Sequence, residues 1–170
     1  MKQNLQQIKK AKAGDTDAFA ELYSSIYSDL YRFALYTLKN PTDAEDIVSE
    51  TVMDAYISIH KLRSAESFKS WIFKILSTKC KQRFKETQSS TVELSETFPD
   101  KGSFTSLEEL MDLRHHFFQL ENEDRLIISM HIFAGYTSQE IAKILHMNAN
   151  TIRSKEHRAL KKLADQLNSQ

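Results

Sequence analysis

The stretch "EIAKILHMNANTIRSKEHRALKKL", residues 140–163, begins an amphipathic pattern, interrupts it with an Asn-rich segment and then resumes it. Apolar residues recur at a spacing of three or four before the interruption and again after it, which predicts two helices joined by a sharp turn. The second half carries five Lys or Arg residues and a single Glu. A short helix, a tight turn and a cationic helix are typical of a helix-turn-helix unit, whose second helix enters the major groove of DNA.

The interruption meets the steric demands of such a unit. Ala142 is small where the two helices cross, and Ile152 supplies an apolar residue for the inner face of the second helix. The turn residue is usually Gly because the backbone there has a positive φ. Here the turn residue is His146, a type enriched in that conformation. Asn148 is expected to cap the second helix.

The second helix has two unlike faces. At about 100° per residue, one stripe holds Ile152, Ala159, Leu160 and Leu163. Thr151, Ser154, Lys155, Arg158, Lys161 and Lys162 point away from this stripe, and Arg153 and His157 flank its boundary. Such a face can bind phosphates and reach base edges. The competing interpretation is a solvated face on an ordinary helical hairpin.

Glu156 is the exception on this helix, because it lies in the middle of the apolar stripe. Burying a lone carboxylate is costly. We therefore expect Glu156 to extend its carboxylate to solvent, to pair with a neighbouring Lys or Arg, or to face a partner.

Helical periodicity continues outward through most of the chain. It predicts helices at about 19–38, 42–62, 68–84, 106–119, 122–133, 137–145 and 149–166, with Thr42 and Glu45 forming a capping box. Three Gly, two Pro and no bounded alternating segment leave little support for strands. Residues 87–105 are polar and rich in Ser and Thr, which indicates a flexible linker. The fold class is therefore all-α, with helical domains at 1–86 and 106–170.

The helix expected at 68–84 carries a cationic stripe beside aromatic residues. Lys74, Thr78, Lys81 and Lys85 share one face, whereas Phe68 and Trp71 belong to the inner face. A cationic groove beside aromatic rings suits single-stranded nucleic acid. The alternative is that the aromatic residues are core and the lysines keep the surface soluble, and for Phe68 and Trp71 the core interpretation is favoured.

The helix expected at 42–62 is acidic on its solvent side. Asp43, Asp46, Glu50 and Asp54 lie there, opposite a buried stripe that includes Ile47 and Thr51. A structural role at the helix N-terminus explains the first two carboxylates. A metal site is disfavoured because no His interleaves with the carboxylates, so a partner-docking face is the stronger functional hypothesis.

Charge is sorted along the chain although it sums to zero, with 23 cationic and 23 acidic residues. Residues 12–59 carry a net −6, residues 60–86 a net +6, residues 87–124 a net −7 and residues 149–162 a net +4. A uniformly basic nucleic-acid binder is excluded, but two local cationic surfaces are predicted.

Several classes of protein are disfavoured by what the sequence lacks. The single cysteine, Cys80, cannot form an intrachain disulfide, and no zinc-ligand spacing occurs. No signal peptide or apolar stretch of about 20 residues appears, so we expect a cytoplasmic protein without membrane insertion. No nucleophile–base pair or phosphate-binding loop is recognisable, so we expect neither an enzyme nor a cofactor.

Several stretches together resemble a known family. They are "DAFAELYSSIYSDLYRFALYTLKNPTDAEDIVSETVMDAY" (17–56), "FKSWIFKIL" (68–76), "LENEDRLIISMHIFAGYTSQEIAKIL" (120–145) and "TIRSKEHRALKKL" (151–163). In this order they resemble the extracytoplasmic-function (ECF) group of bacterial sigma-70 family RNA polymerase sigma factors. The resemblance implies a region 2-like domain at 1–86 and a region 4-like domain at 106–170. The expected function is that of an alternative sigma factor, which directs core RNA polymerase to promoters with −35 and −10 elements.

The resemblance also implies roles for individual residues. Docking on the clamp helices of the largest polymerase subunit would involve Asp43, Asp46, Ile47, Glu50, Thr51 and Asp54. Recognition and melting of the −10 element would involve Arg63, Ser64, Lys74, Thr78, Lys81 and Lys85. The −35 element would be read by Thr151, Arg153, Ser154, Lys155, His157 and Arg158. The second domain would also contact the polymerase flap, and an anti-sigma factor is a further expected partner.

Three positions depart from the family pattern. Thr78 stands where Asn is usual, His146 where Gly is usual, and Glu156 where an apolar residue is usual. The first bears on downstream specificity and the other two on the pose of the reading helix.

Two rival interpretations remain at this stage. A helix-turn-helix regulator that is not a sigma subunit would need a sensor or receiver half, typically with strands and Gly-rich turns. A helical adaptor or anti-sigma-type protein would lack the two cationic faces. The sequence favours neither.

Overall fold

Local capping signals set where the helices begin and end. The computed structural model describes residues 2–86 and 107–167, so the predicted linker lies outside the described residues. Asp15 caps helix α2 (Thr16–Leu38) by accepting a hydrogen bond from the Ala18 amide at 3.0 Å. The N-cap of helix α3 (Pro41–Ser58) lies two residues earlier in the sequence than predicted. Asn40 is its N-cap and Pro41 its first residue, so the expected Thr42 cap is wrong.

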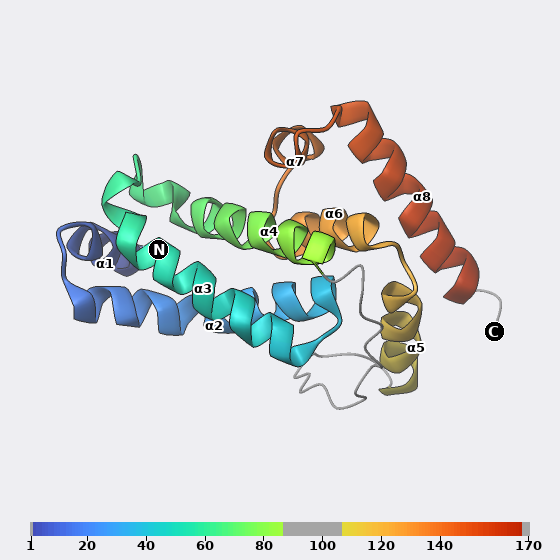
Figure 1. Cartoon of the computed structure of the whole chain (residues 1–170), viewed down its shortest axis with the longest axis horizontal. Coiled ribbons are helices and arrows are strands. Elements are labelled where there is room, and N and C mark those ends of the chain that lie inside the picture. Colours follow the sequence, from blue (N-terminus) through green and yellow to red (C-terminus); the bar gives the residue numbers. More distant parts are fainter. Residues whose placement is uncertain (1, 87–106, 168–170) are drawn as a thin grey trace.

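The N-terminal half is a bundle built on an antiparallel pair. Helices α2 and α3 pack side by side, α4 (Phe68–Glu86) packs on both, and α1 (Lys2–Lys12) covers one end (Figure 1). Two 3₁₀ turns, Ile59–Lys61 and Ala65–Ser67, connect α3 to α4. The predicted inner faces are buried, among them those formed by Phe33, Leu30 and Ile72. The free thiol of Cys80 is also fully buried in this core.

The C-terminal half contains four helices that end in the helix-turn-helix unit. They are α5 (Leu107–Phe118), α6 (Asn122–Ile132), α7 (Ser138–Leu145) and α8 (Ala149–Leu167). Together with the first half they confirm the all-α fold class, and the part of the chain that the structure describes contains no strand. None of these described helices has the length and apolar character needed to cross a membrane.

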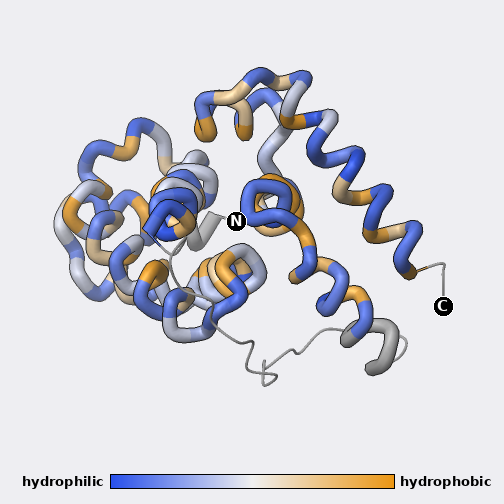
Figure 2. The backbone as a smooth tube through the Cα atoms, turned by 45° about the vertical axis from the view of Figure 1, so that its right-hand side comes forward, coloured by the Kyte–Doolittle hydropathy of each residue, from blue (hydrophilic) through white to orange (hydrophobic). Residues whose placement is uncertain are grey.

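The two halves share one hydrophobic core. Helix α6 packs against α2 and α4, and Leu126, Ile127 and Met130 of α6 join the same buried cluster as Phe33 and Phe73. Figure 2 shows α6 between the N-terminal bundle and α8. The predicted boundaries separate two units along the sequence, but in the structure these two units pack against each other.

Candidate nucleic-acid and protein-docking surfaces

The turn of the helix-turn-helix unit has the predicted geometry. A capping box fixes the start of α7, with Thr137 and Glu140 each accepting from the other's backbone amide. His146 takes the left-handed conformation with φ 56° and ψ 48°, and the Met147 amide donates to the Ala142 carbonyl at 2.9 Å. Asn148 then accepts from the Asn150 amide at 2.8 Å, as expected for the cap of α8.

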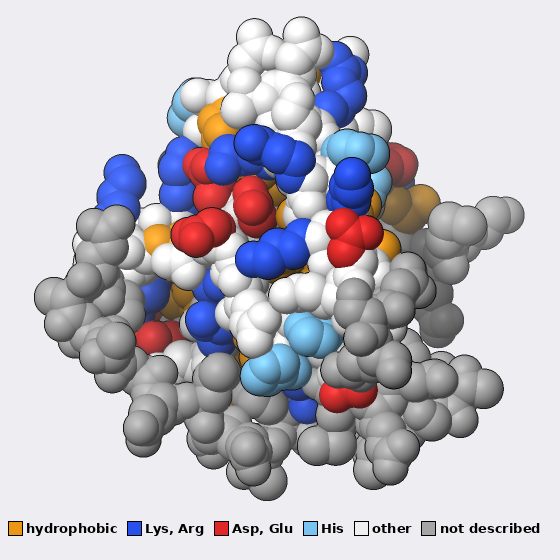
Figure 3. Space-filling view, turned by 90° about the vertical axis from the view of Figure 1, so that its right-hand side faces the viewer, with side chains coloured by type: hydrophobic (Ala, Val, Ile, Leu, Met, Phe, Trp, Pro, Cys, Tyr) orange, Lys and Arg blue, Asp and Glu red, His pale blue; other side chains and the backbone are white. Residues whose placement is uncertain are grey.

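Most of the residues predicted to read DNA are exposed on α8. This set, the upstream face, comprises Thr151, Arg153, Ser154, His157 and Arg158. Arg158 Nε donates to the Ser154 carbonyl at 3.2 Å, which lays its guanidinium along the helix surface. Figure 3 views the molecule from the side on which α5 and α8 lie, and cationic side chains gather there among a few carboxylates.

Lys155 and Leu160 do not lie where the stripe analysis placed them. Lys155 Nζ lies 2.8 Å from Glu123 Oε2 and 3.6 Å from Asp124 Oδ1, so it fastens α8 to the start of α6. The hydrogen bond to Glu123 raises the pKa of Lys155. Leu160, predicted to face inward, is 47% exposed, whereas Ile152, Ala159 and Leu163 are buried as predicted.

Glu156 has a polar partner on each of two neighbouring helices. Its side chain is 17% exposed, with one oxygen 3.6 Å from His131 Nε2 of α6 and the other 3.5 Å from Ser138 Oγ of α7. The sequence left open whether this carboxylate reaches solvent, pairs with a neighbouring Lys or Arg, or faces a partner; in the structure its partners are a His and a hydroxyl of the same chain. The carboxylate joins α8 to both helices beneath it.

The cationic stripe of α4, here called the α4 face, is only partly open. Lys74, Thr78 and Lys85 are exposed, and Arg63 and Ser64 are exposed in the segment before the helix. Lys81 is half-buried, and its Nζ donates to the Leu145 carbonyl of α7 at 2.7 Å. Phe68 is buried and Trp71 is half-buried, as expected for core residues.

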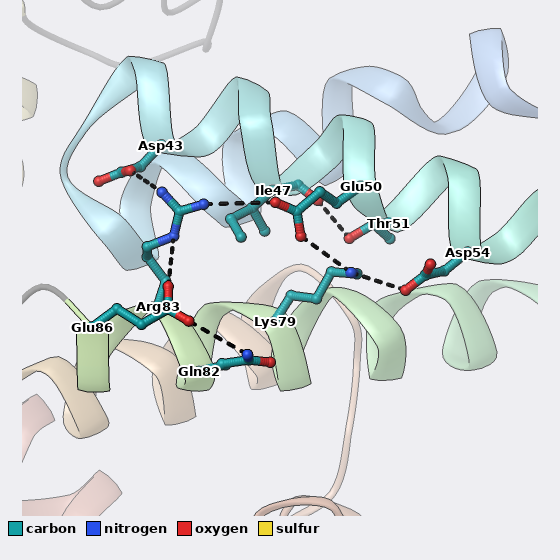
Figure 4. A network of polar contacts seen from close by, with 9 residues as sticks. All are labelled: Asp43, Ile47, Glu50, Thr51, Asp54, Lys79, Gln82, Arg83 and Glu86. Carbon is teal, nitrogen blue, oxygen red and sulfur yellow. Dashed lines mark hydrogen bonds and ion pairs between the residues drawn. The ribbon is translucent and has the colours of Figure 1, made fainter.

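Three of the four predicted docking carboxylates are bound within the chain itself. Figure 4 shows that the ion-pair network joins α3 to α4. Lys79 Nζ lies 3.2 Å from Glu50 and 2.9 Å from Asp54, and Arg83 pairs with Asp43. Burial alone would lower the pKa of Lys79, but the hydrogen bonds to the two carboxylates outweigh it and raise this pKa.

The remaining docking residues divide by burial. Asp46 is exposed on α3 and makes no ion pair with any described residue. Ile47 is 3% exposed and Thr51 is fully buried, with its hydroxyl donating to the Ile47 carbonyl at 2.7 Å. Both side chains face the core, so neither can contact a partner in this structure, and we remove them from the docking set.

The sequence analysis missed an exposed apolar patch on the same helix. Met53 is 65% exposed, Tyr56 48% and Ile57 67%. Large apolar residues at relative positions 0, 3 and 4, outside the buried stripe, are the signal that could have identified them. Exposed apolar side chains grouped on α3, about two turns and more beyond Asp46, mark a candidate protein-binding surface. By contrast, the described residues contain no group of three or more side chains suited to hold a metal ion.

Comparisons with known proteins cover both helical units. The family model described as Sigma-70 region 2 matches residues 22–90, and the model described as Sigma-70, region 4 matches residues 119–163. RNA polymerase sigma factor SigV of Bacillus subtilis (strain 168) is 33% identical over 146 residues, which are 82% of this chain and 84% of the relative. ECF RNA polymerase sigma factor SigX of the same organism is 25% identical over 160 residues, which are 86% and 82% of the two chains.

Solved structures share the arrangement of the helices. The sigma factor RpoE in complex with the anti-sigma factor NepR from Bartonella quintana is 25% identical, with a TM-score of 0.69 over 88% of this chain and 96% of that chain. CnrH in complex with the cytosolic domain of CnrY has a TM-score of 0.68 at 20% identity, over 98% and 97% of the two chains, and shows likeness of fold alone.

Proposed function

The chain belongs to the ECF group of sigma-70 family RNA polymerase sigma factors. We propose that it acts as an alternative sigma factor and that each of its exposed surfaces binds a different part of the promoter or the polymerase. Such a factor binds core RNA polymerase and directs initiation to particular promoters. The family consists of initiation factors that are themselves non-catalytic. Region 2 and region 4 matches in one chain also leave the two rival interpretations, a separate regulator and an adaptor, without support.

The upstream face of α8 reads the −35 element in this proposal. Arg153, Ser154, His157 and Arg158 project from the exposed side of the second helix of the helix-turn-helix, and Thr151 lies near its N-terminus. Arg side chains suit base edges and phosphates, and hydroxyls suit phosphates. Lys155 has a secondary role, because its ammonium is held by Glu123 and Asp124.

The α4 face and the segment before it engage the −10 element. Lys74, Lys85 and Arg63 are exposed cations that can bind the phosphates of a single strand. The hydroxyls of Thr78 and Ser64 donate to the Lys74 carbonyl and to Glu66, so in this arrangement they can only accept hydrogen bonds from bases. Lys81 would contribute only after it leaves the Leu145 carbonyl.

Core polymerase docks on α3 through a smaller acidic set than the sequence indicated, together with an apolar anchor. Within the predicted docking set, Asp46 is the carboxylate that makes no ion pair with a described residue, and Met53 and Ile57 offer exposed apolar area of the kind that supplies binding energy at the centre of an interface. The edge of this surface is formed by Asp43, Glu50 and Asp54, which also hold α3 to α4 through their ion pairs. The occupant is the pair of clamp helices of the largest subunit, with the region 4-like unit (106–170) contacting the flap.

A further partner and a compartment follow from the same assignment. The likeness to a sigma factor solved with an anti-sigma factor supports an anti-sigma factor as a regulator of this chain. Core polymerase acts in the bacterial cytoplasm, so the chain works there. The domain boundaries are those of the sequence prediction, 1–86, 87–105 and 106–170.

The observation that carries the proposal is the coincidence of the two matched regions with two helical units, each of which exposes a cationic helix face. The test is transcription by purified core polymerase, with and without this chain, on a library of genomic promoter fragments. We expect co-elution with core and initiation at a subset of fragments that share two elements. Absence of co-elution would reject the proposal, whatever DNA the free chain bound.

A further inference from the structure

Two consecutive residues of the reading helix α8 hold opposite ends of α6. Lys155 Nζ lies 2.8 Å from Glu123 Oε2 and 3.6 Å from Asp124 Oδ1, and both carboxylates belong to the first turn of α6. Glu156 Oε1 lies 3.6 Å from Nε2 of His131, in the last turn of the same helix. At about 1.5 Å of rise per residue, the two attachment points are about 10 Å apart along α6.

Apolar packing between α8 and α6 surrounds this pair of residues. Ile152 and Ala159 are buried about one turn before and one turn after it, and α8 is inclined to α6 (Figure 1). Packed helices keep preferred crossing angles only within about 15–20°. Over the roughly 8 Å from Glu156 to Thr151, a rotation of about 15° displaces the reading residues by about 2 Å.

A displacement of that size matters for recognition of bases. Hydrogen bonds to base edges need donor–acceptor distances of about 2.7–3.2 Å, so a shift of about 2 Å breaks them. Two polar contacts at separate points along α6 define a direction, which apolar contact alone does because of its non-directional nature only loosely. Lys155 and Glu156 are therefore placed to fix the angle of the reading helix.

Glu156 also ties the reading helix to the other helix of the helix-turn-helix unit. Its second oxygen lies 3.5 Å from Oγ of Ser138, the first residue of α7. By contrast, Arg153 and Arg158 make hydrogen bonds within α8, to Asn150 Oδ1 and to the Ser154 carbonyl. The outward cations of the helix remain available to a ligand while the inward pair is occupied by the chain itself.

We propose that Lys155 and Glu156 are positioning residues for −35 recognition, which clamp α8 at a fixed angle on α6 and so set the base preference of the upstream face without touching DNA. Lys155 then acts through Glu123 and Asp124, where the sequence analysis assigned it a direct DNA contact. Glu156, the departure from the family pattern, acts through His131 and Ser138. This role rests on the proposed reading of the −35 element by the upstream face.

The test changes the α6 side of the clamp, so that the sequence of α8 stays intact. Glu123→Gln/Asp124→Asn releases Lys155, and His131→Ala removes the partner of Glu156. Holoenzyme with wild type or variant is titrated with −35 duplexes that differ at single base pairs. The ratio of affinities for the preferred and the altered duplex should fall roughly two- to fivefold in each variant, as for the loss of an exposed ion pair. His131→Lys keeps a cation opposite Glu156 and should restore the ratio.

Glu121→Gln is the matched control. Glu121 directly precedes α6, is exposed, and forms no ion pair with any other described residue. Its loss should leave the ratio unchanged. Removing negative charge near DNA strengthens binding to every duplex alike, and a ratio cancels this uniform gain.

A role of Lys155 as a simple phosphate contact gives a different result. Glu123→Gln/Asp124→Asn would then tighten binding to every duplex and steepen its salt dependence by about 1, with an unchanged ratio, and this outcome overturns the proposal. An unchanged ratio for His131→Ala removes Glu156 from the clamp. Circular dichroism checks folding, and Glu123→Gln alone replaces the double variant if that variant unfolds.

Failure of the clamp and failure of the proposed function are distinguishable. A wild-type holoenzyme that does not distinguish the duplexes rejects the assignment of the upstream face, and the clamp with it. Discrimination by wild type that every variant retains rejects the clamp alone.

Discussion

At the scale of single residues, two of the three positions that depart from the family pattern have a local physical account. His146 takes the left-handed turn conformation that the usual Gly would take, and Glu156 finds His131 and Ser138 below the reading helix. Both departures therefore leave α8 presented in the orientation that the turn requires. What an individual residue on α8 does to DNA is then decided by its own chemistry and exposure.

Arg158→Ala should weaken DNA binding selectively. If its guanidinium reaches base edges, the loss is about 1–3 kcal/mol and is confined to particular positions of the −35 element. Lys161→Ala, on the same helix and also exposed, should cause a smaller loss that is uniform across sequences. Holoenzyme binding to a library of −35 variants distinguishes the two, and a uniform loss for Arg158→Ala would mark it as a phosphate contact.

Glu140→Gln should weaken the start of α7 in a pH-dependent way. The hydrogen bond from the Thr137 amide lowers the pKa of the Glu140 carboxyl below its ordinary value. Its contribution to stability is therefore complete above the ordinary pKa of about 4.5 and is lost as the pH falls through the lowered one. Urea unfolding at pH 7 should show a loss of about 0.5–1 kcal/mol for the variant, and the difference from wild type should shrink as the pH falls below about 4.5. A difference that stays constant across this range would contradict the capping role.

At the scale of helices, pairing between α3 and α4 changes the meaning of the acidic helix. Asp43, Glu50 and Asp54 face Arg83 and Lys79 (Figure 4), whereas Asp46 is exposed to solvent. The most exposed apolar side chains of α3, Met53 and Ile57, lie on the same face of the helix, about two and three turns further along. The helix therefore serves two purposes along one length, holding the bundle on one side and offering a docking surface on the other.

Asp43→Asn and Asp46→Asn should separate these two purposes. Asp43→Asn removes one partner of a partly buried pair with Arg83 and should lower the free energy of unfolding by about 1 kcal/mol. Asp46→Asn should leave stability within about 0.5 kcal/mol of wild type and weaken association with core polymerase. Urea denaturation and a core-binding titration measure the two effects. Unchanged core binding for both Asp46→Asn and Met53→Ala would exclude this part of α3 from the docking surface.

At the scale of the whole molecule, the two halves are joined through a buried cation. Arg125 is 1% exposed and donates to the Thr37 carbonyl of α2, to the Leu120 carbonyl and to Asn122 Oδ1. Burial lowers the pKa of Arg125 to about 10, so it still carries its charge at neutral pH. No carboxylate of the described residues forms an ion pair with it, although the charge of Glu121 favours the cation, and carbonyl oxygens near the ends of helices supply partial negative charge.

Arg125→Met should uncouple the halves. The change leaves buried carbonyls without donors and should cost about 1–3 kcal/mol. Trp71 is the only tryptophan in the sequence and lies in α4, so its fluorescence reports the N-terminal half, whereas circular dichroism reports all helices. In wild type the two denaturation curves should coincide, and in the variant the circular dichroism curve should begin to fall at lower denaturant. Arg153→Met, at an exposed position, is the control that should leave the curves together.

The amino-acid sequence by itself determined the helices, their inner faces and the turn at His146, because these depend on spacing along one helix and on local backbone conformation. It also identified the two cationic segments and the family that they resemble. Which of those charged side chains are bound within the chain, and which remain available to a partner, depends on how the helices pack. Lys81 and Lys155, and three of the four carboxylates predicted to dock the polymerase, bind groups far away in the sequence. The physical reason is that an ion pair or a hydrogen bond depends on the distance between side chains on neighbouring helices, and helical periodicity contains no information about that distance.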